Sequence, residues 1–298
     1  MGSSHQLMAG FSLGDAGNYA VLFNATGNNQ LQINSSPVNG STVSGNIGIG
    51  GSYGQAQFNN PAVINGNVNF SGAANLHYNV PIYGTISANV SSVNNDLAYL
   101  NNLSATLGAE SGNSIAINAG NNQSQTINIT SGLLDGNGTY IFNVASLNLQ
   151  NGGSLYINGN GLNDVVFNIN SSVHFAGNIF LEGGLTTSDV LFNILGNSTL
   201  QTAANHATLN GTFLDMNGII NVNSVIINGG LYGGGGGNMQ IVSGSTVFTP
   251  VFTPVPEPTT VLAGLLLLLP LGISSLRILR SLNARRLRVQ PVEPFPGR

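Results

Sequence analysis

The side chains of this sequence that could perform acid–base or metal chemistry are ten carboxylates and four histidines, and cysteine is absent. Nine of the carboxylates precede residue 277, whereas residues 1–276 contain neither Lys nor Arg. Polysaccharide lyases, which are common among repetitive β-folds, use Lys or Arg as a base and a cation to hold the substrate carboxylate. Lyase chemistry of this kind is therefore excluded. A glycosidase needs only two facing carboxylates, so whether the chain could be one depends on where its acidic residues lie.

Two aspartates, Asp164 and Asp189, each stand directly before a repeated strand sequence at equal spacing. This position predicts a turn or strand-entry residue that accepts hydrogen bonds from local backbone, rather than a catalytic acid. The segment 159–164 occurs only once, unlike calcium-binding nonapeptides, and the glycines at 233–237 lack the following Lys-Ser/Thr of a phosphate loop. No i, i+4 or HExxH pair of a zinc site is formed by the four histidines, which are His5, His77, His174 and His206. The sequence therefore predicts a non-enzymatic protein with no catalytic residue, metal or cofactor.

The body of the chain is a repetitive β-sequence with few charges. Only 5% of residues are charged, although 42% are hydrophobic, and the sequence contains 41 glycines and 44 asparagines. The segments 139–144, 164–169 and 189–194 resemble one another, and Phe142, Phe167 and Phe192 recur every 25 residues. A constant spacing predicts stacked coils in which each phenylalanine packs on the next. Asn-Gly pairs supply corners, and asparagine amides can pair from coil to coil where like charges would repel. The sequence thus predicts an all-β solenoid over residues 13–247.

One segment departs from this β-pattern. Residues 91–107 carry Val93, Leu97, Leu100 and Leu107 at helical spacing. Ser91 or Ser92 could cap the start of such a helix, and Gly108 could end it. We expect the apolar stripe to pack along the flank of the solenoid.

The C-terminal part of the chain predicts a membrane anchor. A Pro-rich linker at 248–258 precedes the uncharged segment 259–276, whose eighteen residues would span roughly 27 Å as a helix, close to the thickness of a bilayer core. The tail 277–298 holds all the basic residues of the chain and is predicted to be cytoplasmic, its topology determined by Arg277, Arg280, Arg285, Arg286 and Arg288. Because the body carries no cation to neutralise phosphates, we predict no nucleic-acid partner.

The order of these C-terminal features resembles the PEP-CTERM sorting domain, with Pro256, Glu257 and Pro258 as the sorting motif. The resemblance implies processing by exosortase in a Gram-negative bacterium, with inner-membrane anchoring during export, a final location at the cell surface or outside the cell, and exopolysaccharide or another surface polymer as a partner. Residues 1–12 contain no basic and apolar signal-peptide pattern, so we interpret them as the remnant of a longer N-terminus.

The body shows a second resemblance. Leu13–Leu22, with the sequence LGDAGNYAVL, and Ser44–Gly50, with the sequence SGNIGIG, are similar to ice-binding-like and choice-of-anchor adhesive families. These families imply a right-handed, triangular β-helix with one α-helix alongside. The function predicted first is a structural or adhesive surface protein, and ice binding is the alternative because threonine arrays such as Thr-x-Thr repeats are missing from the sequence. A carbohydrate hydrolase ranks third.

Overall fold

The computed structural model describes residues 10–35, 39–51, 54–203 and 206–250. The chain divides into two compact units, Met1–Phe252 and Thr253–Arg298. The predicted sorting motif at 256–258, the predicted membrane helix at 259–276 and the arginine tail lie outside the described residues. Within the described ranges, no helix is both long and apolar enough to cross a bilayer.

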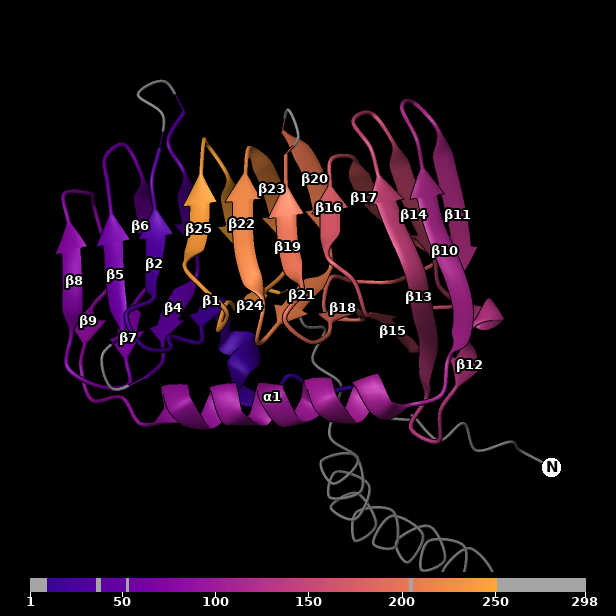
Figure 1. The fold of residues 1–298 in the computed structure, drawn as a ribbon, viewed down its shortest axis with the longest axis horizontal. Coiled ribbons are helices and arrows are strands. Elements are labelled where there is room, and N and C mark those ends of the chain that lie inside the picture. Colours follow the sequence, from indigo (N-terminus) through magenta and orange to yellow (C-terminus); the bar gives the residue numbers. More distant parts are fainter. Residues whose placement is uncertain (1–9, 36–38, 52–53, 204–205, 251–298) are drawn as a thin grey trace, which may run out of the picture. The chain divides into compact units, whose positions relative to one another are not determined.

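The described residues between 10 and 250 form a β-solenoid of mainly parallel strands with one long helix beside it, which confirms this part of the predicted fold class (Figure 1). Its strands lie on three faces, which we name the helix face, the amide face and the hydroxyl face after what lies on the outward side of each. The helix face contains β9 (Ile86–Ser87), β7 (Val68–Phe70), β4 (Asn46–Ile49), β1 (Tyr19–Phe23), β24 (Leu231–Gly233), β21 (Thr212–Asp215), β18 (Val190–Ile194), β15 (Asp164–Ile169) and the first half of β13 (Thr139–Leu149).

The other two faces are exposed sheets of similar length. The amide face contains β8 (Asn75–Tyr78), β5 (Gln55–Phe58), β2 (Gln30–Ile33), β25 (Met239–Val242), β22 (Ile219–Asn223), β19 (Thr199–Thr202), β16 (Val173–Phe175), the second half of β13, and β10 (Asn113–Ala119). The hydroxyl face contains β6 (Val63–Asn65), β3 (Thr42–Ser44), β26 (Thr246–Phe248), β23 (Val225–Asn228), β20 (Ala207–Asn210), β17 (Asn178–Glu182), β14 (Ser154–Asn158) and β11 (Ser124–Asn128).

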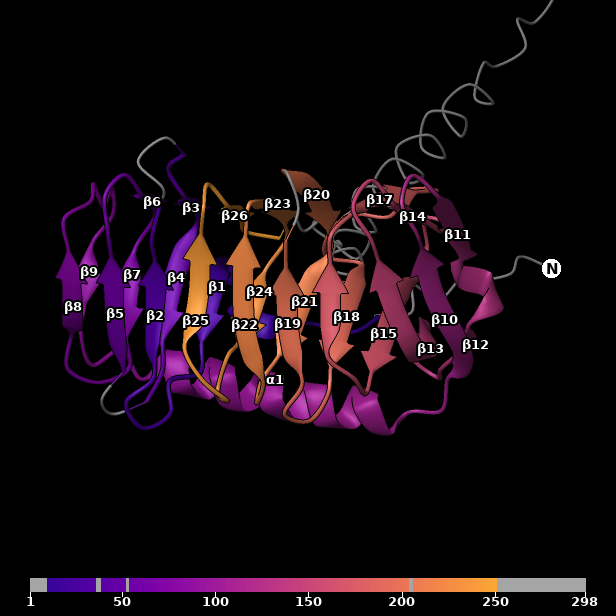
Figure 2. The same ribbon diagram turned by 45° about the horizontal axis from the view of Figure 1, so that its top comes forward.

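The coils do not stack in the order of the sequence. The winding begins with β1 in the middle of the solenoid and proceeds outward through β1–β9 to one end, after which helix α1 (Ser92–Ala109) carries the chain to the opposite end (Figures 1 and 2). From there β10–β26 wind back until the last coil meets the first. At this seam β24 pairs with β1, β25 with β2 and β26 with β3, all in parallel. The repeat predicted stacked coils but not this seam.

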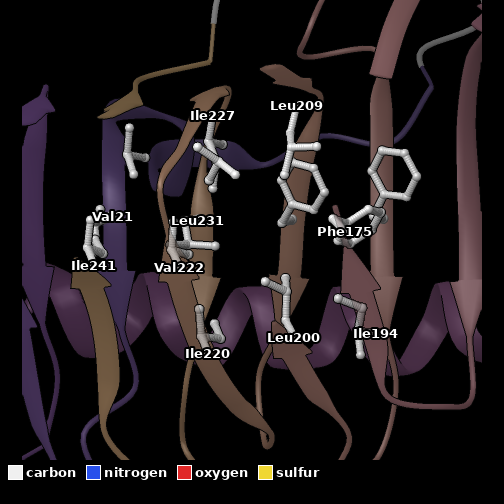
Figure 3. Packing of buried hydrophobic residues seen from close by; sticks show 14 of the residues in the cluster. Val21, Phe175, Ile194, Leu200, Leu209, Ile220, Val222, Ile227, Leu231 and Ile241 are labelled. Carbon is white, nitrogen blue, oxygen red and sulfur yellow. The ribbon is translucent and has the colours of Figure 1, made fainter. Parts of the chain in front are cut away.

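The interior contains the aromatic ladder that the 25-residue repeat predicts. Phe142, Phe167 and Phe192 are fully buried, and neighbouring ring centroids lie 5.3 and 5.2 Å apart in stacked geometry. Phe213 extends the stack, with its centroid 5.0 Å from that of Phe192. Figure 3 shows buried side chains from the three faces meeting in the interior, among them Val21 of the first coil and Leu231 of the last. The seam is therefore packed as continuously as the other coil boundaries.

Helix α1 lies over the outward side of the helix face. Val93, Leu97 and Leu100 are buried against Leu22, Val166, Leu191, Leu214 and Tyr232 of the strands, so the predicted apolar stripe is confirmed. Ser91 stands at the predicted N-cap position, but its side chain makes no capping hydrogen bond. The predicted end at Gly108 is wrong, because the helix continues to Ala109, with Gly108 packed closely on Leu195.

A buried amide network fixes how the helix sits on the strands. Asn168 donates to the carbonyl of Leu107 at 2.7 Å, and Asn193 donates to the carbonyl of Ser104 at 3.0 Å. Asn193 Nδ2 also lies 2.8 Å from Asn168 Oδ1, while the Ser104 hydroxyl donates to Asn193 Oδ1 at 2.6 Å. Every group in this network has a partner, so it specifies one register of the helix without leaving buried polar atoms unsatisfied.

Candidate binding surfaces

The fold leaves two broad faces for contact with a partner. The helix face is buried on both sides, as shown by the fully buried strands β1 and β18. On the amide and hydroxyl faces, buried and partly exposed residues alternate along each strand. Outward side chains at equivalent positions of successive coils therefore form rows, which we call files, and neighbouring residues within a file lie about 4.8 Å apart. The composition of these files decides what each face can bind.

The hydroxyl face carries an uninterrupted file of β-branched residues. The Cα register places Thr208 beside Ile226, Ile226 beside Thr246, Thr246 beside Thr42, and Thr42 beside Val63. All five side chains are half-buried by their neighbours, and no register shift interrupts these pairings. The file crosses the seam, because Thr246 belongs to the last coil and Thr42 to the first. It presents methyl and hydroxyl groups at regular spacing with no charge.

A second file on the same face is more varied. Tyr156 and Phe180 stack at 5.0 Å near one end. Asn210 and Asn228 follow further along, joined by a hydrogen bond of 2.8 Å. Phe248 is 38% exposed beside Asn228. This file is too irregular in size to present a repeating surface.

The amide face carries one column of amide and imidazole side chains along its whole length. In register order its members are His77, Gln57, Gln32, Gln240, Asn221, Gln201, His174, Asn148 and Asn118. Gln240 donates to Gln32 at 2.8 Å across the seam, and Asn148 donates to Asn118 at 3.2 Å. These contacts confirm that amides pair between coils, as the asparagine content predicts.

The two aspartates singled out from the sequence lie next to each other at a corner of the helix face. The Asp189 carboxylate accepts from the amide and hydroxyl of Thr186 at 2.6 and 2.8 Å, so its interpretation as a local turn residue is confirmed. Asp164 differs, because its carboxyl accepts from the amide of Phe11 in the N-terminal segment. Burial raises the pKa of Asp164 to about 7, with further increases from Asp189 and Asp135 and a smaller opposing effect of that amide. Asp164 thus holds the N-terminal segment against the solenoid, a role that the sequence did not predict.

A third carboxyl is buried without any signal in the sequence. Asp215 is fully buried at the end of β21, where Oδ1 accepts from the amide of Gly218 at 2.9 Å and Oδ2 has no hydrogen-bond partner. Burial raises its pKa to about 7, although the amides of Gly218 and Leu200 favour the charged form slightly. The fully buried carboxyl closes the tight corner between β21 and β22, so we interpret it as a structural group.

The remaining candidate residues are dispersed. His77 and His174 lie on the amide face several coils apart, His206 directly precedes a strand of the hydroxyl face, and His5 lies outside the described residues. In the described part of the chain, no group of three His, Asp or Glu residues could hold a metal ion. The segment 159–164 is a turn in which Asn160 Oδ1 accepts from the amides of Leu162 and Asn163, and the glycines at 233–237 form the corner between β24 and β25.

These observations define a class of protein: a helix-flanked β-solenoid whose coils meet at an internal seam and whose two open faces are nearly free of charge. The chain belongs to the family of ice-binding-like adhesive domains, whose family profile matches residues 8–244. The members of this family are non-enzymatic, in agreement with the sequence prediction.

Solved structures show the same fold. An ice-binding protein from the Antarctic ascomycete Antarctomyces psychrotrophicus matches with a TM-score of 0.55 and 16% identity, over 82% of this chain and 100% of that chain. The DUF3494 domain of Shewanella frigidimarina ice-binding protein 1 matches with a TM-score of 0.53 and 16% identity, over 82% and 98%. An ice-binding protein from an Arctic yeast, LeIBP, matches with a TM-score of 0.53 and 16% identity, over 85% and 99%. No curated protein sequence matches this chain. At these identities the likeness shows the fold alone.

Proposed function

We propose that this domain adheres to ice, and that the hydroxyl face is the contact surface. The observation that carries this proposal is the file Thr208, Ile226, Thr246, Thr42 and Val63, which aligns five β-branched side chains in five successive coils. The membership of the chain in the ice-binding-like adhesive family supports the same function.

The physical argument rests on how such a file orders water. Methyl groups cannot hydrogen-bond and so restrict the orientation of the water beside them, while hydroxyl groups fix individual waters by hydrogen bonds. Methyl groups that recur about every 4.8 Å, together with the hydroxyl groups of Thr208, Thr246 and Thr42, can hold a layer of waters in a repeating arrangement that merges with an ice lattice. A charged side chain in the file would instead keep its own liquid-like hydration shell. The lack of Lys and Arg in residues 1–276 therefore suits this role.

Ice-affinity partitioning and ice-recrystallisation assays test the proposal. Thr246→Lys and Ile226→Lys place a long charged side chain at the centre of the file, and we expect each to reduce partitioning into ice at least about tenfold, because a flat surface contact fails when one group protrudes. Asn221→Lys, at the centre of the amide face, is the matched control and should partition like the wild type. Equal partitioning of all three variants, or no partitioning of the wild type, would refute ice binding through this face.

A second function is adhesion to an uncharged polymer through the amide face, which the column from His77 to Asn118 favours. Amides both donate and accept, so a column of them can pair with the hydroxyl groups of a neutral polysaccharide such as an exopolysaccharide. In a pull-down on neutral and acidic glycans, this alternative predicts retention that is lost in Asn221→Lys and kept in Thr246→Lys. The same two variants thus separate the two functions.

We further propose that the domain acts outside the cytoplasm of a Gram-negative bacterium. The sequence supports this through the motif Pro256, Glu257 and Pro258, the apolar segment 259–276 and the arginine tail. The motif would be processed by exosortase, after anchoring in the inner membrane with the tail on the cytoplasmic side. Expression behind a signal peptide, in hosts with and without exosortase, tests this, and a protein that stays soluble and full-length in both hosts would refute it.

A further inference from the structure

The two ends of the solenoid differ in how their edge strands are finished. At one end, the side chain of Gln125 occupies the free edge of β10: its Oε1 accepts from the amide of Asn118 at 2.6 Å and its Nε2 donates to the carbonyl of Ala116 at 2.9 Å. The chain then turns through the 3-10 helix η2 (Ile129–Ser131) into β12 (Leu133–Leu134), which pairs antiparallel with β13. Ile117 and Ile129 are fully buried beneath this arrangement. This end is closed.

The opposite end has no comparable cover among the described residues. There β8 pairs only with β5, and β9 only with β7, so both strands are outermost in the solenoid (Figures 1 and 2). We call residues 75–87 the open end. Tyr78, Tyr83 and Ile86 are 53%, 75% and 40% exposed. Leu76 and Ile82, which occupy core positions of this coil, are only partly buried.

The chemistry of the open end suits a partner that brings a strand edge of its own. The outer side of β8 presents backbone N–H and C=O groups that no described residue pairs, and such edges are templates for another strand. Natural proteins usually block such an edge with lysine or another charge. Between Asp15 and Asp96 the sequence contains no charged residue. The end therefore has no charge to repel an identical end and none to attract a charged partner.

We propose that the open end binds the open end of a second copy of this chain, related by a two-fold axis. Such an axis sets β8 antiparallel to the β8 of the partner, so that the two edge strands can join through an antiparallel ladder of backbone hydrogen bonds. Tyr78 and Tyr83 supply aromatic side chains of the kind that is enriched at protein interfaces. At the far end Gln125 covers the edge of β10, so that this strand is not free for the same pairing, and the proposed assembly is a dimer.

Cross-linking through introduced cysteines gives a direct test, because the native chain contains no cysteine. His77→Cys places a thiol on β8 at the open end. Asn118→Cys is the matched control, since Asn118 lies in the same column of the amide face at the closed end. The full chain is treated with a short bis-maleimide in mild detergent at about 10 µM, a concentration at which a moderately stable dimer is populated. We expect covalent dimers in the His77→Cys variant only.

Sedimentation of the same full chain provides the second measurement. Tyr78→Lys combined with Tyr83→Lys should raise the dimer dissociation constant at least about tenfold, since lysine on an edge opposes pairing. Ile219→Lys, on the amide face away from both ends, should leave it unchanged. If the double variant fails to fold, the cross-linking of His77→Cys, which adds no bulk, decides the question.

Three outcomes would overturn the proposal. The first is a wild-type chain that stays monomeric at about 100 µM, far above the range of a specific dimer. The second is equal cross-linking of the His77→Cys and Asn118→Cys variants. The third is a monomer in which the thiol of the His77→Cys variant is protected from maleimide, because this would show that the chain's own C-terminal segment covers the open end.

Discussion

The buried carboxyl of Asp215 predicts an unusual dependence of stability on pH. In the folded protein the pKa of Asp215 is about 7, against 3.8 for the unperturbed carboxyl. Between pH 4 and pH 7 the unfolded chain has therefore lost a proton that the folded chain keeps. Stability falls as the pH rises through this window and levels off above pH 7, because there both states are ionised. The two pKa values correspond to about 4 kcal/mol lost between these limits.

The variant Asp215→Asn isolates this effect. Its Oδ1 can still accept from the amide of Gly218, and it never ionises, so the loss of about 4 kcal/mol at high pH disappears. The new Nδ2 group takes the place of Oδ2, which has no partner, and an unpaired buried donor costs about 1–3 kcal/mol. The first effect is larger. We therefore expect the free energy of unfolding of the Asp215→Asn variant to exceed that of the wild type by about 1–3 kcal/mol at pH 8. Near pH 4 we expect no gain over the wild type.

Urea unfolding followed by circular dichroism at pH 4, 5, 6, 7 and 8 measures this difference. Asp15→Asn is the control, because Asp15 is an exposed carboxylate on the 3-10 helix η1 (Gly14–Asn18) and should change little at any pH. Asp164 ionises in the same window, so the wild type should lose stability from both sites and Asp215→Asn should keep part of the slope. The reasoning is refuted if the wild type is equally stable at pH 5 and pH 8, or if Asp215→Asn is less stable than the wild type at pH 8.

Four further predictions concern the core, the helix and the anchor. Phe167→Ala should destabilise the domain by about 3–5 kcal/mol in urea melts, because it empties a fully buried site in the ring stack, and a loss below about 1 kcal/mol would contradict the packing. Asn193→Ala should cost about 2–4 kcal/mol, since it leaves Asn168 Oδ1 and the Ser104 hydroxyl without their partner beneath the helix, whereas the exposed Asn148→Ala should stay within about 0.5 kcal/mol of the wild type. Glu257→Ala should leave the full-length form uncleaved on immunoblots from an exosortase-producing host, and unchanged cleavage would exclude Glu257 from the sorting motif. Glutamate in place of the five arginines should reduce retention in the membrane fraction, the substituted positions being Arg277, Arg280, Arg285, Arg286 and Arg288.

The repeated coils and the helix could be predicted from the sequence because both leave a local signal. The Phe142, Phe167 and Phe192 spacing reflects coils that follow one another in sequence and in space. Likewise, the stripe from Val93 to Leu107 reflects the period of a single helix. The seam leaves no such signal, since Val21 and Leu231 are far apart in the chain and no repeat joins their coils. Pairing between remote coils is decided by tertiary packing alone.

The same reason explains why the candidate ice-binding file was missed. Thr42, Thr208 and Thr246 are isolated in the sequence, and a search for Thr-x-Thr repeats passes over them. They become neighbours only when the seam sets the register of five separate strands, with Ile226 and Val63 completing the file. The role of Asp164 was misjudged in a related way. Its partner is the amide of Phe11, which no local turn rule could supply.

The seam also bears on how the protein is made. The first coil, β1–β3, is flanked on one side by β4–β6, but its other neighbour is the last coil, which ends at Phe248. At a synthesis rate of 5–20 residues per second, that neighbour leaves the ribosome roughly 10–40 s after Ser44. Throughout this interval one side of the first coil stays bare, and contacts so distant in sequence also close slowly. The winding order thus keeps the domain incomplete until its last coil has been synthesised.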